Sequence, residues 1–477
     1  MKLKIFLLII ILSSFVFAQE NVYDSINVKV NIDSSINIEK ESNYKIEYLI
    51  VNMIFKPHSY YLQDATSIFY SSPKGKELDE GIWEFNEYYE NINYGVESLI
   101  NSKIKKYYID KKVLYPNNFD QDEYTKSTET INSDDLQIKR QAELIAGNKD
   151  DLYEIVFDIG EWVNQEIDYS LNSLTEELNQ DASWTFQNRY GVCDEITTLF
   201  VAMVRSIGIP AKFVSGVAYT DKIDNFGNHA WAEVYFPEYG WIPFDVTYGQ
   251  YGFVDSTHIK MRESNDPKEP SISYKWKARG IELNAGEVNT KTEIILRGNK
   301  YNENLDIEIY LPEEEYGIGS YIPAVVKVHN LDKYYRSSGI YISKSPIIMN
   351  DTRQNFLLRP NETIFLSYIV GLEENSDNKF EYSSEIEVKT IFDKSVSEKI
   401  KYSKDYSYYS EEDAKDYINN FEFYYNEIQE TVYMNETIKE EPKVEIEESS
   451  NNKLMFFIFS LAFIVFVLIL MIFIKRN

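Results

Sequence analysis

Three side chains of this sequence have the types and the chain order of a nucleophile, a base and an orienting carboxylate. Cys193 is the only cysteine among the 477 residues. His229 follows it by 36 residues (229 − 193), and Asp245 follows by 16 more (245 − 229). A thiol beside an imidazole that a carboxylate orients is the arrangement that turns cysteine into a covalent catalyst. The residues therefore predict a Cys–His–Asp catalytic triad.

Cys193 comes directly before a segment that predicts a helix. In DEITTLFVAMVRSIGIP, residues 194–210, the apolar residues recur at helical spacing, and the closing GIP predicts the end of the helix. The helix dipole and the free amides of a first turn stabilise a thiolate. Asp194 and Glu195 oppose this effect with their charge, so the thiol needs a cationic group nearby. His229 is the candidate.

His229 and Asp245 lie in two stretches that predict a β-hairpin. The strands are NHAWAEVYF and WIPFDVT, and the turn between them is PEYG. Near register, Asp245 lies opposite His229 and holds one imidazole nitrogen, while the other nitrogen faces the thiol. Trp231 and Trp241 are predicted to line the site. Because apolar residues anchor the hairpin, an Asp245→Asn change is expected to keep the fold and lower turnover.

The quoted residues resemble the core of the transglutaminase-like superfamily. The resemblance rests on RYGVCDEITTLFVAMVRSIGIPAKFVSGVAY and NHAWAEVYFPEYGWIPFDVTYG, and it covers about a fifth of the chain, roughly residues 153–252. It implies a papain-like Cys-His-Asp core in which Cys193, His229 and Asp245 are catalytic. For the side chain that holds the oxyanion it leaves three candidates open, Gln187, Trp184 and Gln165. The flanking regions and the C-terminal apolar segment also look like those of archaeal-type membrane-anchored cell-surface members.

Pattern and composition predict an α+β multidomain chain, with a papain/transglutaminase-like catalytic core between two β-sandwich domains. Alternating apolar and polar residues indicate half-buried strands before and after the core. The predicted parts are, in order, a signal peptide at 1–18, an N-terminal β-sandwich-like domain at 21–125, a transglutaminase-like α+β core at 140–255, an immunoglobulin-like β-sandwich at 285–405, an acidic stalk at 406–453 and a transmembrane helix at 454–474.

The two ends of the chain predict export and anchoring. Lys2 and Lys4 precede a short apolar run, which is the layout of a signal peptide. The uncharged run at 454–474 has the length needed to cross a bilayer, and Lys475 with Arg476 places the C-terminus in the cytoplasm. We therefore expect a single-pass protein of the cell membrane with an extracellular ectodomain. Its glycosylation candidates are Asn350, Asn361 and Asn435.

The charge balance and the remaining histidines bear on which partners, cofactors and metal ions are expected. Lys and Arg total 48 against 77 Asp and Glu, a formal net charge of -29, which disfavours nucleic acid because phosphates would be repelled. We expect no cofactor and no metal ion, since neither a phosphate-binding glycine loop nor a zinc-ligand cluster is present. His58, His258 and His329 are predicted to be structural.

The favoured interpretation is an enzyme that acts on amide bonds of a protein or peptide substrate outside the cell through a Cys193 thioester. It would be a peptidase or amidase if water resolves the thioester, and a crosslinking acyltransferase if an amine does. The alternative is a catalytically silent binding or scaffold protein that retains the fold. A third hypothesis uses the lone thiol in an intermolecular disulfide.

Overall fold

The computed structural model describes residues 22–105, 107–171, 180–220, 224–347, 349, 352–374, 379–423 and 425. The chain divides into one unit, Met1–Ile418, and a second unit, Asn419–Asn477. The predicted signal peptide (1–18), the predicted membrane helix (454–474), Asn350 and Asn435 lie outside the described residues. Within the described ranges, no helix has both the length and the apolar composition to cross a bilayer.

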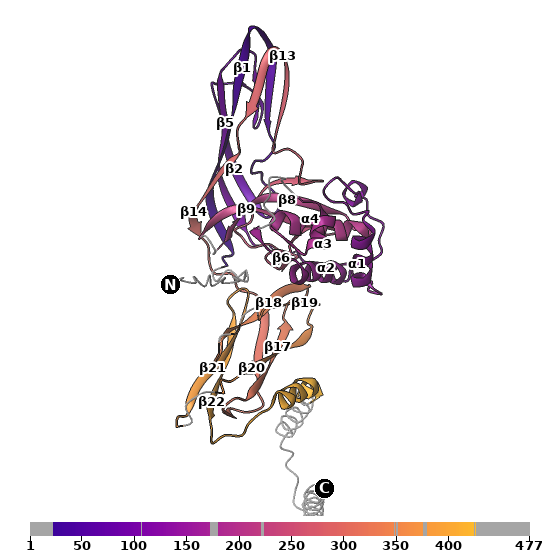
Figure 1. The fold of residues 1–477 in the computed structure, drawn as a ribbon, viewed down its shortest axis with the longest axis vertical. Helices are drawn as coiled ribbons and strands as arrows, with labels where there is room; N and C mark the ends of the chain where they lie inside the picture. Colours follow the sequence, from indigo (N-terminus) through magenta and orange to yellow (C-terminus); the bar gives the residue numbers. More distant parts are fainter. Residues whose placement is uncertain are drawn as a thin grey trace, which may run out of the picture. The chain divides into compact units, whose positions relative to one another are not determined.

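The N-terminal region is built on one 29-residue strand, β1 (Ser25–Met53). Alternate residues of β1 from Ile26 to Ile38 are buried, which is the pattern of a strand with one face on a core. Both edges of β1 are paired (Figure 1). One edge carries β5 (Asn91–Lys103) and β4 (Ile82–Phe85), and the other carries β14 (Asn289–Arg297) and β13 (Ile272–Ala285). The sheet is completed by β2 (Gln63–Ser72) and β3 (Lys76–Asp79).

This sheet corrects two of the predicted domain assignments. The N-terminal region is one seven-stranded sheet, not a pair of stacked sheets, and its buried face shares a core with Val217, Ile259 and Met261 from the middle of the chain. The predicted C-terminal sandwich starts too early at 285, because Asn289–Arg297 pairs with the first half of β1. A strand pattern shows which face is buried but not which edge the strand will join, and an unpaired edge as long as that of β1 demands a partner.

The middle of the chain folds into an antiparallel five-stranded sheet covered by helices. The strand order is β11 (Gln250–Tyr251), β10 (Gly240–Asp245), β9 (Asn225–Phe236), β8 (Ala211–Thr220) and β12 (Ile259–Ser264). The helices are α1 (Leu136–Ala146), α2 (Leu152–Glu166), α3 (Ala182–Asn188) and α4 (Cys193–Ser206). A parallel pair of short strands, β6 (Asp168–Tyr169) and β7 (Tyr190–Gly191), leads the chain into α4.

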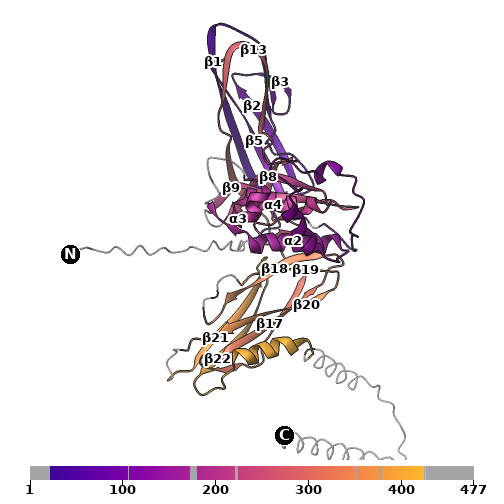
Figure 2. The same cartoon turned by 45° about the vertical axis from the view of Figure 1, so that its right-hand side comes forward.

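Helix α4 is the centre of this core. The sequence predicts one apolar face, but every residue from Glu195 to Arg205 is buried. The difference arises because α4 lies between the sheet and the other helices (Figure 2), so that polar residues are enclosed as well. Arg205 is the clearest case, since its guanidinium donates to the carbonyl oxygens of Ala211, Lys126 and Asn265. Such a charge can be buried only because each donor finds an acceptor.

The region after β14 forms a sandwich of two sheets around a common core, as the sequence predicted for most of it. The first sheet consists of β15 (Leu305–Tyr310), β17 (Tyr321–Asn330) and β20 (Thr363–Gly371). The second consists of β16 (Glu315–Gly317), β22 (Ser395–Ser403), β21 (Tyr382–Thr390), β18 (Arg336–Lys344) and β19 (Gln354–Leu358). Residues 411–423, within the predicted stalk, are helical.

Side chains from both flanking regions hold the core sheet. Gln63 of β2 donates to the carbonyl of Lys260 and accepts from its N–H, at 2.9 and 3.0 Å. Arg353, just before β19, donates to the carbonyl oxygen of Gly249 at 2.9 Å. Gly249 belongs to the turn that follows β10, so the C-terminal sandwich supports the segment directly after Asp245.

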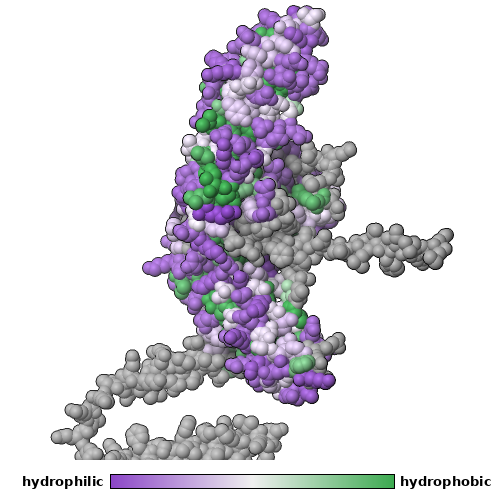
Figure 3. All heavy atoms as spheres, turned by 90° about the vertical axis from the view of Figure 1, so that its left-hand side faces the viewer, coloured by the Kyte–Doolittle hydropathy of each residue, from purple (hydrophilic) through white to green (hydrophobic). Residues whose placement is uncertain are grey.

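The surface agrees with the acidic composition. The face in Figure 3 is mainly hydrophilic, with separate apolar patches. On β14, which lies on this side, Ile295 and Leu296 are both exposed.

Two glycines of the core sheet give a matched test of its packing. A Cβ at Gly216 of β8 would lie 2.1 Å from the carbonyl oxygen of Ile259, whereas one at Gly227 of β9 would meet nothing within 4 Å. We expect Gly216→Ala to lower the free energy of unfolding by about 2 kcal/mol, because β12 must move away. Gly227→Ala should change it by less than about 0.5 kcal/mol. Urea unfolding measures both, and equal stabilities would contradict the close approach of β8 and β12.

Candidate active site

Cys193 is the first residue of α4, as the sequence predicted. The chain enters the helix through Gly191, where a Cβ would lie 2.7 Å from the Cβ of Glu195. The Glu195 carboxylate accepts from the N–H of Val192 at 2.9 Å, which closes the first turn. Glycine is therefore required for the thiol to sit at the very start of the helix.

The thiol of Cys193 is half-buried and stays protonated in the resting site. Its sulfur lies 3.8 Å from Oδ1 of Asp194, and the backbone N–H of Ala230 donates to it. Burial raises the pKa of the thiol well above its usual range, the Asp194 charge raises it further, and the Ala230 contact opposes both. The expectation that Asp194 disfavours a thiolate is confirmed. Activation of the thiol therefore requires a base.

His229 and Asp245 are directly bonded. The Nε2 atom of His229 lies 2.7 Å from Oδ2 of Asp245, and both side chains are buried. The predicted register is displaced by two residues, because Phe244 lies opposite Ala232 and Asp245 therefore comes opposite Trp231 and not His229. The bond is diagonal across the hairpin, and it forms because His229 and Trp231 share one face of β9.

The other ring nitrogen of His229, Nδ1, is not engaged by Asp245. Since Nε2 is held by Asp245, Nδ1 has no part in that bond. The next residue, Ala230, contacts the Cys193 sulfur through its N–H and accepts a 3.1 Å bond from Thr197 of α4 through its carbonyl. Two successive residues of β9 thus supply the imidazole and tie the strand to the thiol-bearing helix.

The Asp245 carboxylate is fully buried and carries more than one bond. Its Oδ1 atom accepts from the backbone N–H groups of Thr247 and Tyr248, at 2.9 and 3.1 Å. Burial opposes its ionisation, but the attraction and hydrogen bond of His229 and the bond from His258 hold its pKa far below the usual range. The structure supports a different expectation for Asp245→Asn, namely a loss of stability, because this carboxylate also accepts two N–H groups of the turn after β10.

His258 belongs to the same cluster, although the sequence predicted a structural histidine away from the site. Its Nε2 lies 2.9 Å from Oδ2 of Asp245, and its Nδ1 lies 3.3 Å from Oδ1 of Asp255. Burial lowers its pKa, but Asp255 and Asp245 outweigh burial and raise the pKa to about 10. The only feature of the sequence near His258 that could have indicated its role is Asp255, three residues earlier. This spacing does not by itself indicate a contact between His258 and Asp245.

Among the described residues, one group of three or more His, Cys, Asp or Glu side chains has ligand atoms close enough to surround a metal ion. It consists of His229, Asp245 and His258, whose atoms all lie within 4.8 Å of one another. These atoms are already hydrogen-bond partners of one another. A metal ion binds neutral imidazole, and the raised pKa of His258 opposes the loss of its proton. The cluster is therefore suited to acid–base chemistry.

The other predicted site residues have different positions. Trp231 is fully buried, and its ring lies 6.3 Å from that of His229. Trp241 precedes Asp245 by four residues, about 13 Å along β10, and its ring packs on Tyr235 and Tyr124.

None of the three oxyanion candidates has a recorded contact with the thiol. Gln165 donates to Glu161 one turn earlier on α2, Trp184 packs against Tyr190, and Gln187 is exposed on α3. Asn361, a glycosylation candidate, is exposed at the turn before β20.

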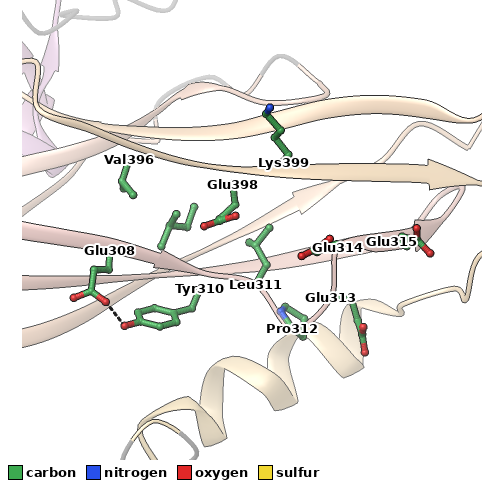
Figure 4. A pocket seen from close by; sticks show the side chains of 11 residues that line it. Glu308, Tyr310, Leu311, Pro312, Glu313, Glu314, Glu315, Val396, Glu398 and Lys399 are labelled. Carbon is green, nitrogen blue, oxygen red and sulfur yellow. Dashed lines mark hydrogen bonds between the residues drawn. The ribbon is translucent and has the colours of Figure 1, made fainter. Parts of the chain in front are cut away.

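A separate hollow lies in the C-terminal sandwich, away from these residues. It has a volume of about 860 Å³ and an acidic lining (Figure 4). Within it, the Tyr310 hydroxyl donates to Glu308. No residue of the Cys193 cluster lines it.

Comparisons with known proteins agree with this core. Residues 139–246 match the sequence model of the Transglutaminase-like superfamily. A curated relative, "Uncharacterized protein YebA" of Bacillus subtilis (strain 168), is 26% identical over 147 residues, which are 27% of this chain and 20% of that protein. The chain thus spans about a fifth of the length of this relative.

Solved structures that match parts of this chain include the "Putative Cysteine Protease from Cytophaga hutchinsonii", with 17% identity and a TM-score of 0.41 over 58% of this chain and 94% of that one. A transglutaminase of red sea bream matches with 10% identity and a TM-score of 0.22 over 76% of this chain and 78% of its own. TM-scores this low support no statement about activity. The β-rich chain described above therefore contains, at residues 139–246, a domain of the Transglutaminase-like superfamily.

Proposed function

We propose that the protein is a thiol enzyme that acts on amide bonds of proteins or peptides through a thioester on Cys193. The observation that carries this proposal is the 2.7 Å bond from Asp245 to Nε2 of His229, which leaves Nδ1 as the base for a thiol on the adjoining helix. A protonated thiol beside a fixed imidazole is the starting state of a nucleophile activated by an adjacent base.

The chemistry follows from these positions. Nδ1 of His229 takes the thiol proton as the sulfur attacks the carbonyl carbon of the amide, and the same nitrogen then gives the proton to the leaving amine as the C–N bond breaks. The developing oxyanion is stabilised by the N–H of Cys193, which is free at the first position of the helix, and by a side chain such as Gln187, Trp184 or Gln165. Water then hydrolyses the thioester to a carboxylic acid and the free thiol, or a second amine attacks the thioester and forms a new amide and the free thiol.

We further propose that this activity is located at the outer surface of the cell membrane, in an archaeal-type arrangement with a single C-terminal anchor. The apolar segment at 454–474 and the N-terminal leader pattern support this location. The acidic composition suits a protein or peptide partner and disfavours nucleic acid.

A catalytically silent binding protein is the second candidate, and one observation favours it. Burial and the Asp194 charge keep the Cys193 thiol protonated. If His229 does not overcome this, the same fold would bind a partner without turnover.

Alkylation separates these two candidates without a known substrate. Because Cys193 is the only cysteine, the rate of iodoacetamide labelling of the full chain reports on this thiol alone. We expect His229→Gln to slow labelling at pH 7 by about tenfold or more, since the base is lost. His329→Gln is the matched control, because His329 is half-buried in the C-terminal sandwich, where it bonds Thr363. Equal labelling rates for all three proteins would rule out an activated thiol.

Acid trapping tests the thioester directly. Full-length protein is mixed with a library of glutamine- and asparagine-containing peptides, quenched in acid and analysed by mass spectrometry. We expect an acyl group on Cys193 and none on a Cys193→Ala variant. Added primary amine distinguishes the outcomes, because an acyltransferase forms the amine adduct and a peptidase or amidase forms only the acid. Absence of any adduct on Cys193 across peptides and esters would favour the binding protein.

Asp245→Asn should affect both turnover and stability. We expect turnover of a peptide that forms the acyl-enzyme to fall by about a hundredfold or more, because the amide no longer fixes the proton of His229. We also expect a loss of about 2–4 kcal/mol in the free energy of unfolding, because a buried acceptor of four bonds is replaced. Calorimetry and kinetics measure the two effects. A variant with native stability and full turnover would exclude Asp245 from the site.

A further inference from the structure

Asp245 is shared by two imidazole rings, and only one of them belongs to the proposed triad. Its Oδ2 atom lies 2.7 Å from Nε2 of His229 and 2.9 Å from Nε2 of His258. The second ring nitrogen of His258 lies 3.3 Å from Asp255, a charged contact without hydrogen-bond alignment. Carboxylate oxygens accept but do not donate, so Nε2 of His258 must carry a hydrogen toward Asp245. A hydrogen on Nδ1 replaces the repulsion between a ring lone pair and the Asp255 carboxylate by attraction, so the geometry favours a buried imidazolium.

The carboxylate on the far side of His258 is held firmly in its ionised form. Oδ1 of Asp255 accepts from the N–H and hydroxyl of Thr257, at 2.7 and 2.5 Å, and Oδ2 accepts from Gln250 at 2.7 Å. Burial opposes its ionisation, but the attraction of His258 and these bonds lower its pKa to about 2. The charge of His258 therefore has a permanent counterion besides Asp245.

The groups facing His258 from other elements supply no competing cation. The rings of Trp231 and Tyr248 lie 5.2 and 5.6 Å from its own, and burial keeps Tyr248 neutral by raising its pKa. The ring of His229 lies at 5.4 Å. Beyond this shell, Arg353 of the C-terminal sandwich and the carboxyl group of Asp194 act on the cluster through their charges.

We propose that His258 is a positioning residue, a buried imidazolium that fixes Asp245 between two rings and cancels part of its charge toward His229. This inference rests on the proposed function and deepens it, because it assigns a fourth side chain to the proton chemistry of Cys193. The chain Asp255–His258–Asp245–His229 alternates carboxylate and imidazole groups and ends at the ring of His229.

The electrostatic consequence has a definite sign. The reactive form of the Cys193–His229 pair has lost one proton relative to the form that dominates in acid. Loss of a proton makes the pair more negative, so the nearby positive charge of His258 favours it. Removal of that positive charge must move the acid limb of Cys193 reactivity to higher pH. Removal of the Asp255 negative charge must move it to lower pH as long as His258, still bonded to Asp245, keeps its proton.

The test is the pH dependence of iodoacetamide labelling at Cys193, measured on the full chain and on two variants. His258→Gln retains a donor toward Asp245 without the charge, and we expect its acid limb to move up by about one pH unit or more. Asp255→Asn is nearly isosteric and removes the opposite charge, and we expect a smaller shift downward because Asp255 lies farther from His229. Thermal unfolding confirms that each variant is folded.

Shifts of the acid limb of the labelling profile in opposite directions are specific to a charge effect. A merely loosened site would lower the labelling rate of both variants without moving their acid limbs apart. Shifts in the same direction, or unmoved limbs in both folded variants, overturn the proposal. Labelling needs no substrate, so this result stands apart from the proposed function. If the limbs move but no acyl-enzyme forms, the imidazolium is real and the catalytic assignment fails.

A second measurement uses the unaltered protein. With ¹⁵N-labelled histidine, four imidazole side chains give signals, and the one lost in His258→Gln is assigned. We expect both ring nitrogens of His258 to remain protonated at pH 8, whereas an unperturbed histidine is neutral there. A His258 ring that has lost its proton at pH 8 overturns the proposal even if neither variant folds.

Discussion

A carboxylate without any access to solvent must obtain from the protein everything that water would otherwise give it, and Asp245 is in this position. Two backbone N–H groups and two imidazole nitrogens supply it. They come from β9, from the turn after β10 and from the residue just before β12, so the carboxylate joins three segments that are separate in sequence. Because an ionised group in this environment is stable only when all its partners are present, the geometry of the site is coupled to the closure of the sheet.

Each element around this carboxylate positions one part of the site. Gly191 before α4 allows Cys193 to be the first residue of the helix. The close pairing of β8 with β12 brings His258 to Asp245. Contacts from Arg353 and Gln63 brace the core sheet from both flanking regions. The flanking regions therefore contribute to the position of the catalytic groups as well as enclosing the core.

Local chemistry was the part that the sequence predicted best. The helix start at Cys193, the β9–β10 hairpin and the opposing effect of Asp194 depend on residues close together in the chain, where periodicity and charge are informative. The register error and the missed contact of His258 have a common cause, which is that neither leaves a periodic pattern in the sequence. The Asp245–His229 bond is diagonal across the hairpin, and His258 precedes a strand that joins the sheet edge after an irregular turn. The pairing of β13 and β14 with β1 is non-local in the same way.

The pairing of β1 has a consequence for how the chain reaches this structure. The first strand receives two of its edge partners from residues 272–297, which are synthesised only after the entire core. The core is thus an insertion within the N-terminal sheet, and that sheet cannot be completed as the chain emerges from its amino end. During synthesis, the free edge of β1 has to be kept from other strands until the insertion has emerged. A fragment that stops after the core would retain this unpaired edge, so the smallest independently folding piece of this protein is expected to be larger than the domain at residues 139–246.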